Sequence, residues 1–340
     1  MHRVIGEREF VDVSVSEDQA RQLLADMIRA RVFDERALAL QRRGWISGYP
    51  PFRGQEGSQV GAGHAMAESD WLFPTYRANA MQLARGVPAS DLLGFRRGLP
   101  EYHSEHDLPI FPQAIPIATQ IPHAVGAGMA ANYTDADHAV VAYFGDGATS
   151  EGDFHEACNF AGVFDAPVLF FCENNHWAIS TTRERQTAAP SIAAKADAYG
   201  FTGGQVDGND PLAVFEFVRS ALKRVREREP VLVESLTYRQ GPHTTSDDPD
   251  RYRGDENLPE WRTRDPIDRF AEYLRDHNVI YEGFREHERE EATETIDAAV
   301  ETAEAVEPDP DDVFDYAYAE LPPQLREQRE QVGERASREE

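Results

Sequence analysis

Two short polar groups in this sequence combine residue types that suit a divalent cation and a phosphate. The first, Gly145-Asp146-Gly147, follows an apolar run and precedes a helical pattern. Glycines let a backbone approach an anion closely, a helix N-terminus favours negative charge, and an aspartate can hold a hard cation that bridges to phosphate. A tight turn with the aspartate as a helix cap would give the same tripeptide, so this group alone leaves both interpretations open.

The second group, Asn174–Asn175, ends the next apolar run, and Asn175 follows Asp146 by 29 residues. A strand–helix–strand unit accounts for this spacing, so both groups should lie in neighbouring loops at one edge of a sheet. A carboxylate, an amide oxygen and a backbone carbonyl suit a small cation that takes its other ligands from diphosphate and water. Magnesium therefore fits better than zinc.

Apolar runs rich in Val, Leu and Phe predict the buried parallel strands that would position these groups. The runs are His138–Phe144, Pro167–Cys172 and Val231–Leu236. Helices are predicted over Glu151–Val163, Ser191–Tyr199 and Pro211–Glu229, with a further strand over Phe201–Val206. Alternating strands and helices predict an α/β fold with a right-handed, doubly wound parallel sheet.

The sequence before residue 117 predicts helices and loops rather than a second strand-rich unit. A capping box at Ser16 begins a long N-terminal helix that we expect to end near Gly44. A Gly- and Pro-rich loop leads into a helix near Glu56, Asp91–Leu99 reads as a short helix, and Pro100–Pro116 reads as a loop. We therefore expect an N-terminal helical segment over residues 1–44, one α/β domain over 45–280, and an acidic helical extension over 281–340 whose last part is flexible.

Gly126-Ala127-Gly128 could in principle belong to a dinucleotide-binding fingerprint. It precedes the strand, however, and lies within an apolar helical stretch. Close packing of a helix is therefore the favoured interpretation.

Charge limits the classes of partner that this chain can bind. The 340 residues include 34 Lys and Arg against 61 Asp and Glu, a net charge of −27, and the only lysines are Lys195 and Lys223. This charge argues against nucleic acid as a partner, and the acidic, lysine-poor surface is what we expect of a protein hydrated in a salt-rich cytoplasm. Residues 281–340 hold 20 acidic and 6 basic side chains, which fits a solvated helical tail.

Cysteine usage and hydropathy predict a cytoplasmic protein. Cys158 and Cys172 each lie in an apolar run and read as buried, reduced thiols. The first 20 residues lack the continuous apolar core of a signal peptide, and we expect no membrane span.

Several motifs in order resemble one protein family. GDG, about thirty residues and then NN is similar to the thiamine diphosphate signature, and nearly the whole chain resembles the α subunit of the decarboxylating component of 2-oxoacid dehydrogenase complexes. The matching stretches are ATQIPHAVGAG, YFGDGATSEGDFHEACNFAG, ENNHWAIST, VDGNDPLAV and YRQGPHTTSDDPDRYR.

The resemblance implies the thiamine diphosphate-binding fold and a set of site residues. Mg²⁺ would be held by Asp146, Asn175 and the Trp177 carbonyl. Cofactor-binding positions implied in the same way are Tyr76, Arg77, Ile117, Gly145, Gly147, Ala148, Ile179 and His243. Arg77 has the chemistry to hold diphosphate, because a guanidinium offers a rigid fork to phosphate oxygens.

His243 is the catalytic candidate in this chain. It lies in the turn-rich GPHTTSDDP segment after the last strand, and in the family the matching His lies in a loop over the active site. We expect Arg239, Asp247 and Arg253 to order this loop through ion pairs. Thr244 falls where some animal relatives carry a regulatory phosphoserine, but we do not expect regulation here.

The resemblance also implies partners. The family activates thiamine diphosphate with a glutamate from a second domain, and Glu56 is poorly placed to replace it. We therefore expect a β subunit in an α2β2 heterotetramer, a 2-oxoacid substrate, and a lipoyl group on a dihydrolipoyl acyltransferase as acceptor. An acetoin dehydrogenase α subunit and a noncatalytic cofactor-binding scaffold remain alternatives.

Two departures from the family pattern bear on the substrate. The Pro100–Pro116 segment is shorter than in close relatives, and position 173 is Glu where some branched-chain members have Arg. The choice between pyruvate and branched-chain 2-oxoacids therefore stays open.

Overall fold

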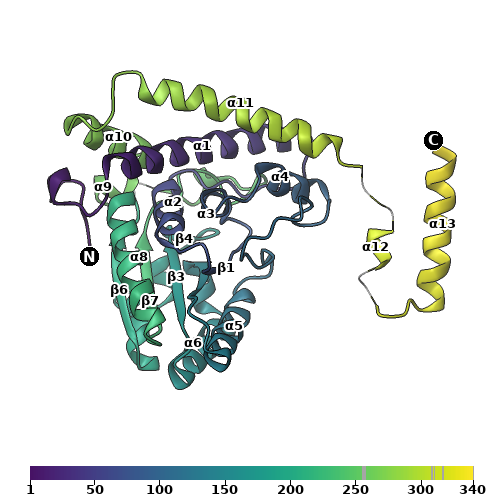
Figure 1. Ribbon diagram of the computed structural model, residues 1–340, viewed down its shortest axis with the longest axis horizontal. Helices are drawn as coiled ribbons and strands as arrows, with labels where there is room; N and C mark the ends of the chain where they lie inside the picture. The colour runs from purple at the N-terminus through teal and green to yellow at the C-terminus, as the bar shows by residue number, and fades with distance from the viewer. Residues whose placement is uncertain (255–257, 308, 310, 316–317, 340) are drawn as a thin grey trace.

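A five-stranded parallel sheet forms the centre of the computed structural model, which describes residues 1–254, 258–307, 309, 311–315 and 318–339 (Figure 1). The strand order is β1-β2-β3-β7-β6, and every neighbouring pair is parallel. The strands are β1 (Trp71–Phe73), β2 (Val140–Gly145), β3 (Val168–Asn174), β6 (Thr202–Asp207) and β7 (Val231–Leu236). The predicted doubly wound sheet is confirmed, and β1 is an additional edge strand that the sequence pattern did not predict.

Alternation along the strands divides the interior into two cores, one on each face of the sheet. Val141 and Tyr143 of β2 belong to the core that is covered by α1, α2 and α8. Val140 and Phe144 belong to the core that is covered by α5 and α6. Successive side chains point to opposite faces of a strand, so a central strand covered on both faces must be apolar throughout. The covering helices are α1 (Glu17–Arg42), α2 (Glu56–Ala65), α5 (Gln120–Thr134), α6 (Gly152–Phe164) and α8 (Pro211–Arg226).

The helix predictions agree with these elements in most cases. The capping box at Ser16 is present, and Gly44 follows the end of α1 in the left-handed region. In α6 the buried residues are those of the predicted apolar face, including Cys158. The helix predicted over residues 191–199 is an exception, because the structure forms only a 3₁₀ helix there, η3 (Ala193–Tyr199).

Gly128 confirms the packing interpretation of the GAG stretch. It lies in α5, and a Cβ there would come within 2.8 Å of Cγ2 of Val168 in β3, whereas a Cβ on Gly126 would meet nothing within 4 Å. A glycine at position 128 therefore lets α5 lie close to the sheet.

Short elements carry the loops at the carboxyl ends of the strands. They are η2 (Asp146–Ser150), the hairpin of β4 (Trp177–Ala178) and β5 (Thr181–Thr182), α7 (Arg183–Gln186), η4 (Pro249–Arg251) and α9 (Glu260–Thr263). Residues 100–116 contain no helix or strand, as predicted. The remaining elements are η1 (Phe10–Asp12), α3 (Asn79–Ala84), α4 (Ala89–Arg97), α10 (Pro266–Asp276), α11 (Phe284–Ala305), α12 (Asp312–Asp315) and α13 (Pro323–Glu339).

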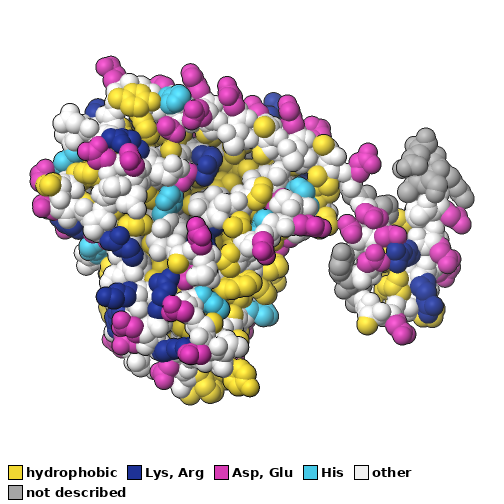
Figure 2. All heavy atoms as spheres, viewed as in Figure 1, with side chains coloured by type: hydrophobic (Ala, Val, Ile, Leu, Met, Phe, Trp, Pro, Cys, Tyr) yellow, Lys and Arg dark blue, Asp and Glu magenta, His cyan; other side chains and the backbone are white. Residues whose placement is uncertain are grey.

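The C-terminal helices differ in how they relate to the sheet domain. Helix α11 packs along α1, while α12 and α13 lie apart from the sheet (Figure 1). Acidic side chains are spread along the visible face of α11 and around α12 and α13 (Figure 2). The division of the chain into segments 1–44, 45–280 and 281–340 stays a prediction. Among the described residues, no helix is both long and apolar enough to cross a membrane.

Candidate functional site

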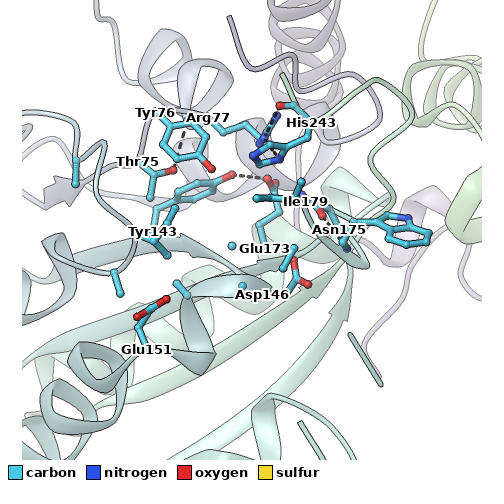
Figure 3. Close-up of a pocket in the computed structure, with 18 of the residues that line it drawn as sticks. Thr75, Tyr76, Arg77, Tyr143, Asp146, Glu151, Glu173, Asn175, Ile179 and His243 are labelled. Atoms are coloured by element: carbon cyan, nitrogen blue, oxygen red, sulfur yellow. Dashed lines mark hydrogen bonds between the residues drawn. The ribbon is translucent and has the colours of Figure 1, made fainter. Parts of the chain in front are cut away.

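A cavity of about 260 Å³ opens where β2 and β3 end. All of the predicted site residues line it: Tyr76, Arg77, Ile117, Gly145, Asp146, Gly147, Ala148, Asn175, Trp177, Ile179 and His243. Figure 3 shows side chains from several loops pointing toward a common space at this edge of the sheet. Ligands of wound parallel sheets bind at this edge.

The strand register brings Asp146 and Asn175 into adjacent loops. Gly145 of β2 pairs with Glu173 of β3. Asp146 is one residue beyond this pair and Asn175 is two residues beyond it. Asp146 is buried, and Oδ2 accepts a hydrogen bond of 2.7 Å from Nε2 of Gln186. Burial raises the pKa of Asp146, although the bond from Gln186 opposes the shift. An oppositely charged ligand would lower this pKa and favour the ionised form.

Asn175 and Trp177 supply two further oxygens. Nδ2 of Asn175 donates to Oε1 of Gln55 at 2.9 Å, which fixes the amide, and Oδ1 accepts from the backbone N–H of Trp177 at 3.2 Å. The Trp177 carbonyl accepts from Nη1 of Arg239 at 3.3 Å. A carboxylate, an amide oxygen and a carbonyl are the donor set of a hard cation.

The turn after β2 is held closely against the β4–β5 hairpin. A Cβ on Gly147 would lie 3.0 Å from Cβ of Ala178, so a larger residue would push the hairpin away. Nζ of Lys195 donates to the Thr149 carbonyl at 2.8 Å. The backbone of Gly147 and Ala148 is thereby placed at the cavity wall.

Arg77 joins three loops at the cavity. Nη1 donates to the Pro51 carbonyl at 2.5 Å, and Nη2 donates to the His243 carbonyl at 2.9 Å and lies 3.0 Å from Nδ1 of His243. The guanidinium carbon lies 5.6 Å from the ring centroid of Tyr76, a cation–π contact.

His243 is neutral in this setting. Burial lowers its pKa to about 3, and the charges of Arg77 and Arg239 add to the shift. Nδ1 faces both guanidiniums, at 3.0 and 3.3 Å. A guanidinium can only donate, so Nδ1 is the acceptor and the ring proton lies on Nε2.

The prediction that ion pairs order the His243 loop is wrong for the described residues, where hydrogen bonds hold the loop instead. Nη2 of Arg239 donates to the Ile179 carbonyl at 2.7 Å, and Arg253 donates to the carbonyls of Gln240 and Gly241 at 3.0 and 2.6 Å. Asp247 accepts from the His243 N–H and from the Tyr252 hydroxyl, each at 2.6 Å. In the described residues, Arg239 and Arg253 therefore bond to backbone carbonyls and not to Asp247.

Other lining residues were not predicted as site residues. They are Thr75, Ala114, Pro116, Ala118, Tyr143, Glu151, Glu173, Ala178 and Arg239. Glu173 is buried, Oε2 accepts from the Tyr143 hydroxyl and from Gln59, and Oε1 has no partner among the described residues. Burial raises the pKa of Glu173 to about 7. An acidic residue inside an apolar strand was the signal that could have identified it.

Three arginines at this end of the sheet have no acidic partner among the described residues. Arg77 and Arg239 are buried and Arg262 is half-buried, and their bonds run to carbonyls, a hydroxyl, an imidazole and the Asn174 amide oxygen. Within the described residues, none of the three forms an ion pair with Asp or Glu. In a chain of net charge −27, such a cluster fits an anionic ligand.

Glu56 lies outside the cavity lining. It is fully buried, and Oε1 pairs with Nε of Arg31 at 2.6 Å. Its structural pairing agrees with the expectation that it is poorly placed for catalysis.

Comparison with known proteins gives consistent matches. The family model "Dehydrogenase E1 component" matches residues 25–311. A relative from Mycobacterium tuberculosis, "3-methyl-2-oxobutanoate dehydrogenase subunit alpha", is 44% identical over 327 residues, covering 93% of this chain and 87% of the relative. "Pyruvate dehydrogenase E1 component subunit alpha" of Bacillus cereus is 38% identical, covering 95% and 88%. "2-oxoisovalerate dehydrogenase subunit alpha" of Bacillus subtilis is 36% identical, covering 90% and 97%.

Proposed function

The chain belongs to the dehydrogenase E1 component family, as an α subunit of the 2-oxoacid dehydrogenase type, and from this premise we propose that its cavity binds Mg²⁺ and thiamine diphosphate. Such subunits are oxidoreductases acting on oxo groups. The observation that carries the proposal is the position of Asp146 and Asn175 just after adjacent strand ends, in the lining of one cavity, beside arginines that have no acidic partner among the described residues.

The residues present fit the metal and the diphosphate. Asp146, Asn175 and the Trp177 carbonyl would hold Mg²⁺, with the remaining ligands from diphosphate and water. Arg77, the backbone of Gly147 and Ala148, and Nε2–H of His243 would hold the diphosphate, because all are donors on the cavity wall. Tyr76, Gly145, Ile117 and Ile179 complete the wall, with Ile117 placed to face the pyrimidine ring.

The chain's own contribution to the reaction is positioning and proton handling. When bound, thiamine diphosphate supplies a nucleophilic carbon and an electron sink for decarboxylation of a 2-oxoacid. His243 is held neutral by burial and by the charges of Arg77 and Arg239, so its Nε2–H can donate to the diphosphate without placing a further charge in the site. The half-buried His243 loop restricts the access of water.

A β subunit completes the site in this proposal. Ile117 and Ile179 are 44% and 57% exposed at the cavity rim, and a cavity of 260 Å³ lies below the roughly 300–1,000 Å³ of most complete ligand sites. The partner would enclose the remainder and bring the activating glutamate in an α2β2 assembly. A lipoyl group on a dihydrolipoyl acyltransferase would accept the acyl product.

The substrate proposed is a branched-chain 2-oxoacid or pyruvate, since relatives named for each cover this chain. The cytoplasmic location stays a prediction, to which the two buried cysteines add support.

Co-expression with the candidate β subunit tests the function. The pair should decarboxylate 3-methyl-2-oxobutanoate or pyruvate in the presence of Mg²⁺ and thiamine diphosphate. The chain alone should be slower by about 100-fold or more, because it lacks the base. Equal rates with and without the β subunit would contradict the shared site, and turnover of acetoin alone would favour the acetoin dehydrogenase alternative.

A further inference from the structure

We propose that Gln186 selects the cation at this site by holding one oxygen of the Asp146 carboxylate away from it. Gln186 is the last residue of α7, a four-residue helix after the β4–β5 hairpin. It is outside the cavity lining and was not singled out by any sequence motif. The inference rests on the proposed function, because it concerns the same metal.

The orientation of the Gln186 amide is determined by its two acceptors. Nε2 donates to Oδ2 of Asp146 at 2.7 Å and to the Thr181 carbonyl at 3.2 Å. A rotated amide would set Oε1 against both oxygens, so the observed orientation is the only favourable one. Oε1 is buried and has no partner among the described residues, so Gln186 keeps this orientation although it leaves a polar atom without a bond.

The bond fixes the orientation of the Asp146 carboxylate and makes its two oxygens unequal. Oδ2 already accepts a hydrogen bond from Gln186, so Oδ1 is the oxygen with more acceptor capacity left for a metal. Asn175 has a single side-chain oxygen, Oδ1, and the bond from its Nδ2 to Gln55 fixes the orientation of the amide. Two protein side chains therefore offer one oxygen each.

Single-oxygen ligation favours the smaller cation. Mg²⁺ requires a near-octahedral shell at about 2.0–2.1 Å, whereas Ca²⁺ accepts more ligands at about 2.3–2.6 Å and readily takes both oxygens of one carboxylate. If Oδ2 were released, Asp146 could turn and present both oxygens, which Ca²⁺ uses and Mg²⁺ does not. Gln186 is therefore a positioning residue, acting through Asp146.

Gln186→Met tests the inference, because methionine has a similar length and cannot donate a hydrogen bond. Affinities for Mg²⁺ and Ca²⁺ would be measured by calorimetry on the co-expressed α/β pair at saturating thiamine diphosphate. Mg²⁺ should bind about 10-fold more weakly, the lower end of the effect of losing a partner of a metal ligand. Ca²⁺ should weaken less, so the Mg²⁺/Ca²⁺ ratio falls. Gln186→Glu should lower the ratio too, because a carboxylate cannot donate to Oδ2 and adds oxygens.

Gln22→Met is the matched control. Gln22 also donates to a carboxylate, Asp26, at 3.2 Å, but it lies on α1 away from the cavity. This variant should keep the wild-type affinities, and circular dichroism should show that both methionine variants are folded at the temperature of the titration.

The outcomes separate this inference from the proposed function. A wild-type α/β pair that binds no Mg²⁺ overturns the metal site and this inference with it. A wild-type α/β pair that binds Mg²⁺, combined with an unchanged Mg²⁺/Ca²⁺ ratio in Gln186→Met, overturns this inference alone. An unchanged ratio includes equal weakening of the binding of both cations, which would show that Gln186 supports the site without selecting the cation.

Discussion

At the scale of single residues, His243 gives the clearest pH prediction. Its pKa is lowered to about 3 by burial and by the charges of Arg77 and Arg239, so the ring should stay neutral from pH 8 down to pH 5. The stabilisation that goes with this neutral form is fully present above the ordinary value of about 6.5 and is lost as the pH falls toward 3. Arg77→Met should raise the pKa of His243, but burial and Arg239 should keep it below 6.5.

Histidine resonances in an NMR titration would measure this pKa, with the His243 signal assigned from a His243→Gln spectrum. His277 is an internal control, because a hydrogen bond to the Tyr273 carbonyl and the nearby Glu9 carboxylate raise its pKa. A His243 signal that titrates near pH 6.5 in the wild type would refute the assigned protonation state.

The site residues that could be predicted from the sequence depend on local order, whereas those that could not be predicted depend on distant partners. Asp146 and Asn175 were predictable because each directly follows a strand, so their positions depend only on local order and register. Arg239 and Gln186 were not assigned to the site, because their roles depend on partners that are distant in sequence. The Arg239–Ile179 and Gln186–Asp146 bonds span 60 and 40 residues.

At the scale of elements, buried strands and amphipathic helices were predictable from periodicity. Strands β2, β3, β6 and β7 and helices α1, α6 and α8 follow the expected ranges within a few residues. Strand β1 was missed because it has three residues, pairs only with β2 within the sheet, and carries too little pattern to detect. The turn of η2 and the β4–β5 hairpin depend on close contacts such as Gly147 against Ala178, which no periodicity encodes.

At the scale of the whole molecule, the net charge of −27 predicts a dependence of stability on salt. The screening length falls from about 10 Å at 0.1 M to about 3 Å at 1 M, so repulsion among exposed carboxylates weakens while the buried arginines around the cavity are little affected. The melting temperature should rise by a few degrees between 0.1 and 1 M KCl. KCl is the suitable salt, because sulfate would also strengthen apolar burial.

Thermal unfolding followed by circular dichroism would measure this shift. An unchanged melting temperature would argue against adaptation to a salt-rich cytoplasm. The site proposal does not depend on that result, because distant charges are screened from the cavity at either concentration.

The central claim, that Asp146 and Asn175 hold a metal that binds the diphosphate, is tested most directly by calorimetric titration of thiamine diphosphate into the co-expressed α/β pair with and without Mg²⁺. Three forms would be compared: the wild type, Asp146→Asn, and Asp197→Asn as a control at an exposed aspartate. The wild type and Asp197→Asn should bind the cofactor only with Mg²⁺, and Asp146→Asn should show no Mg²⁺-dependent binding while it unfolds at the wild-type temperature. Undiminished, Mg²⁺-dependent affinity in Asp146→Asn would contradict the claim.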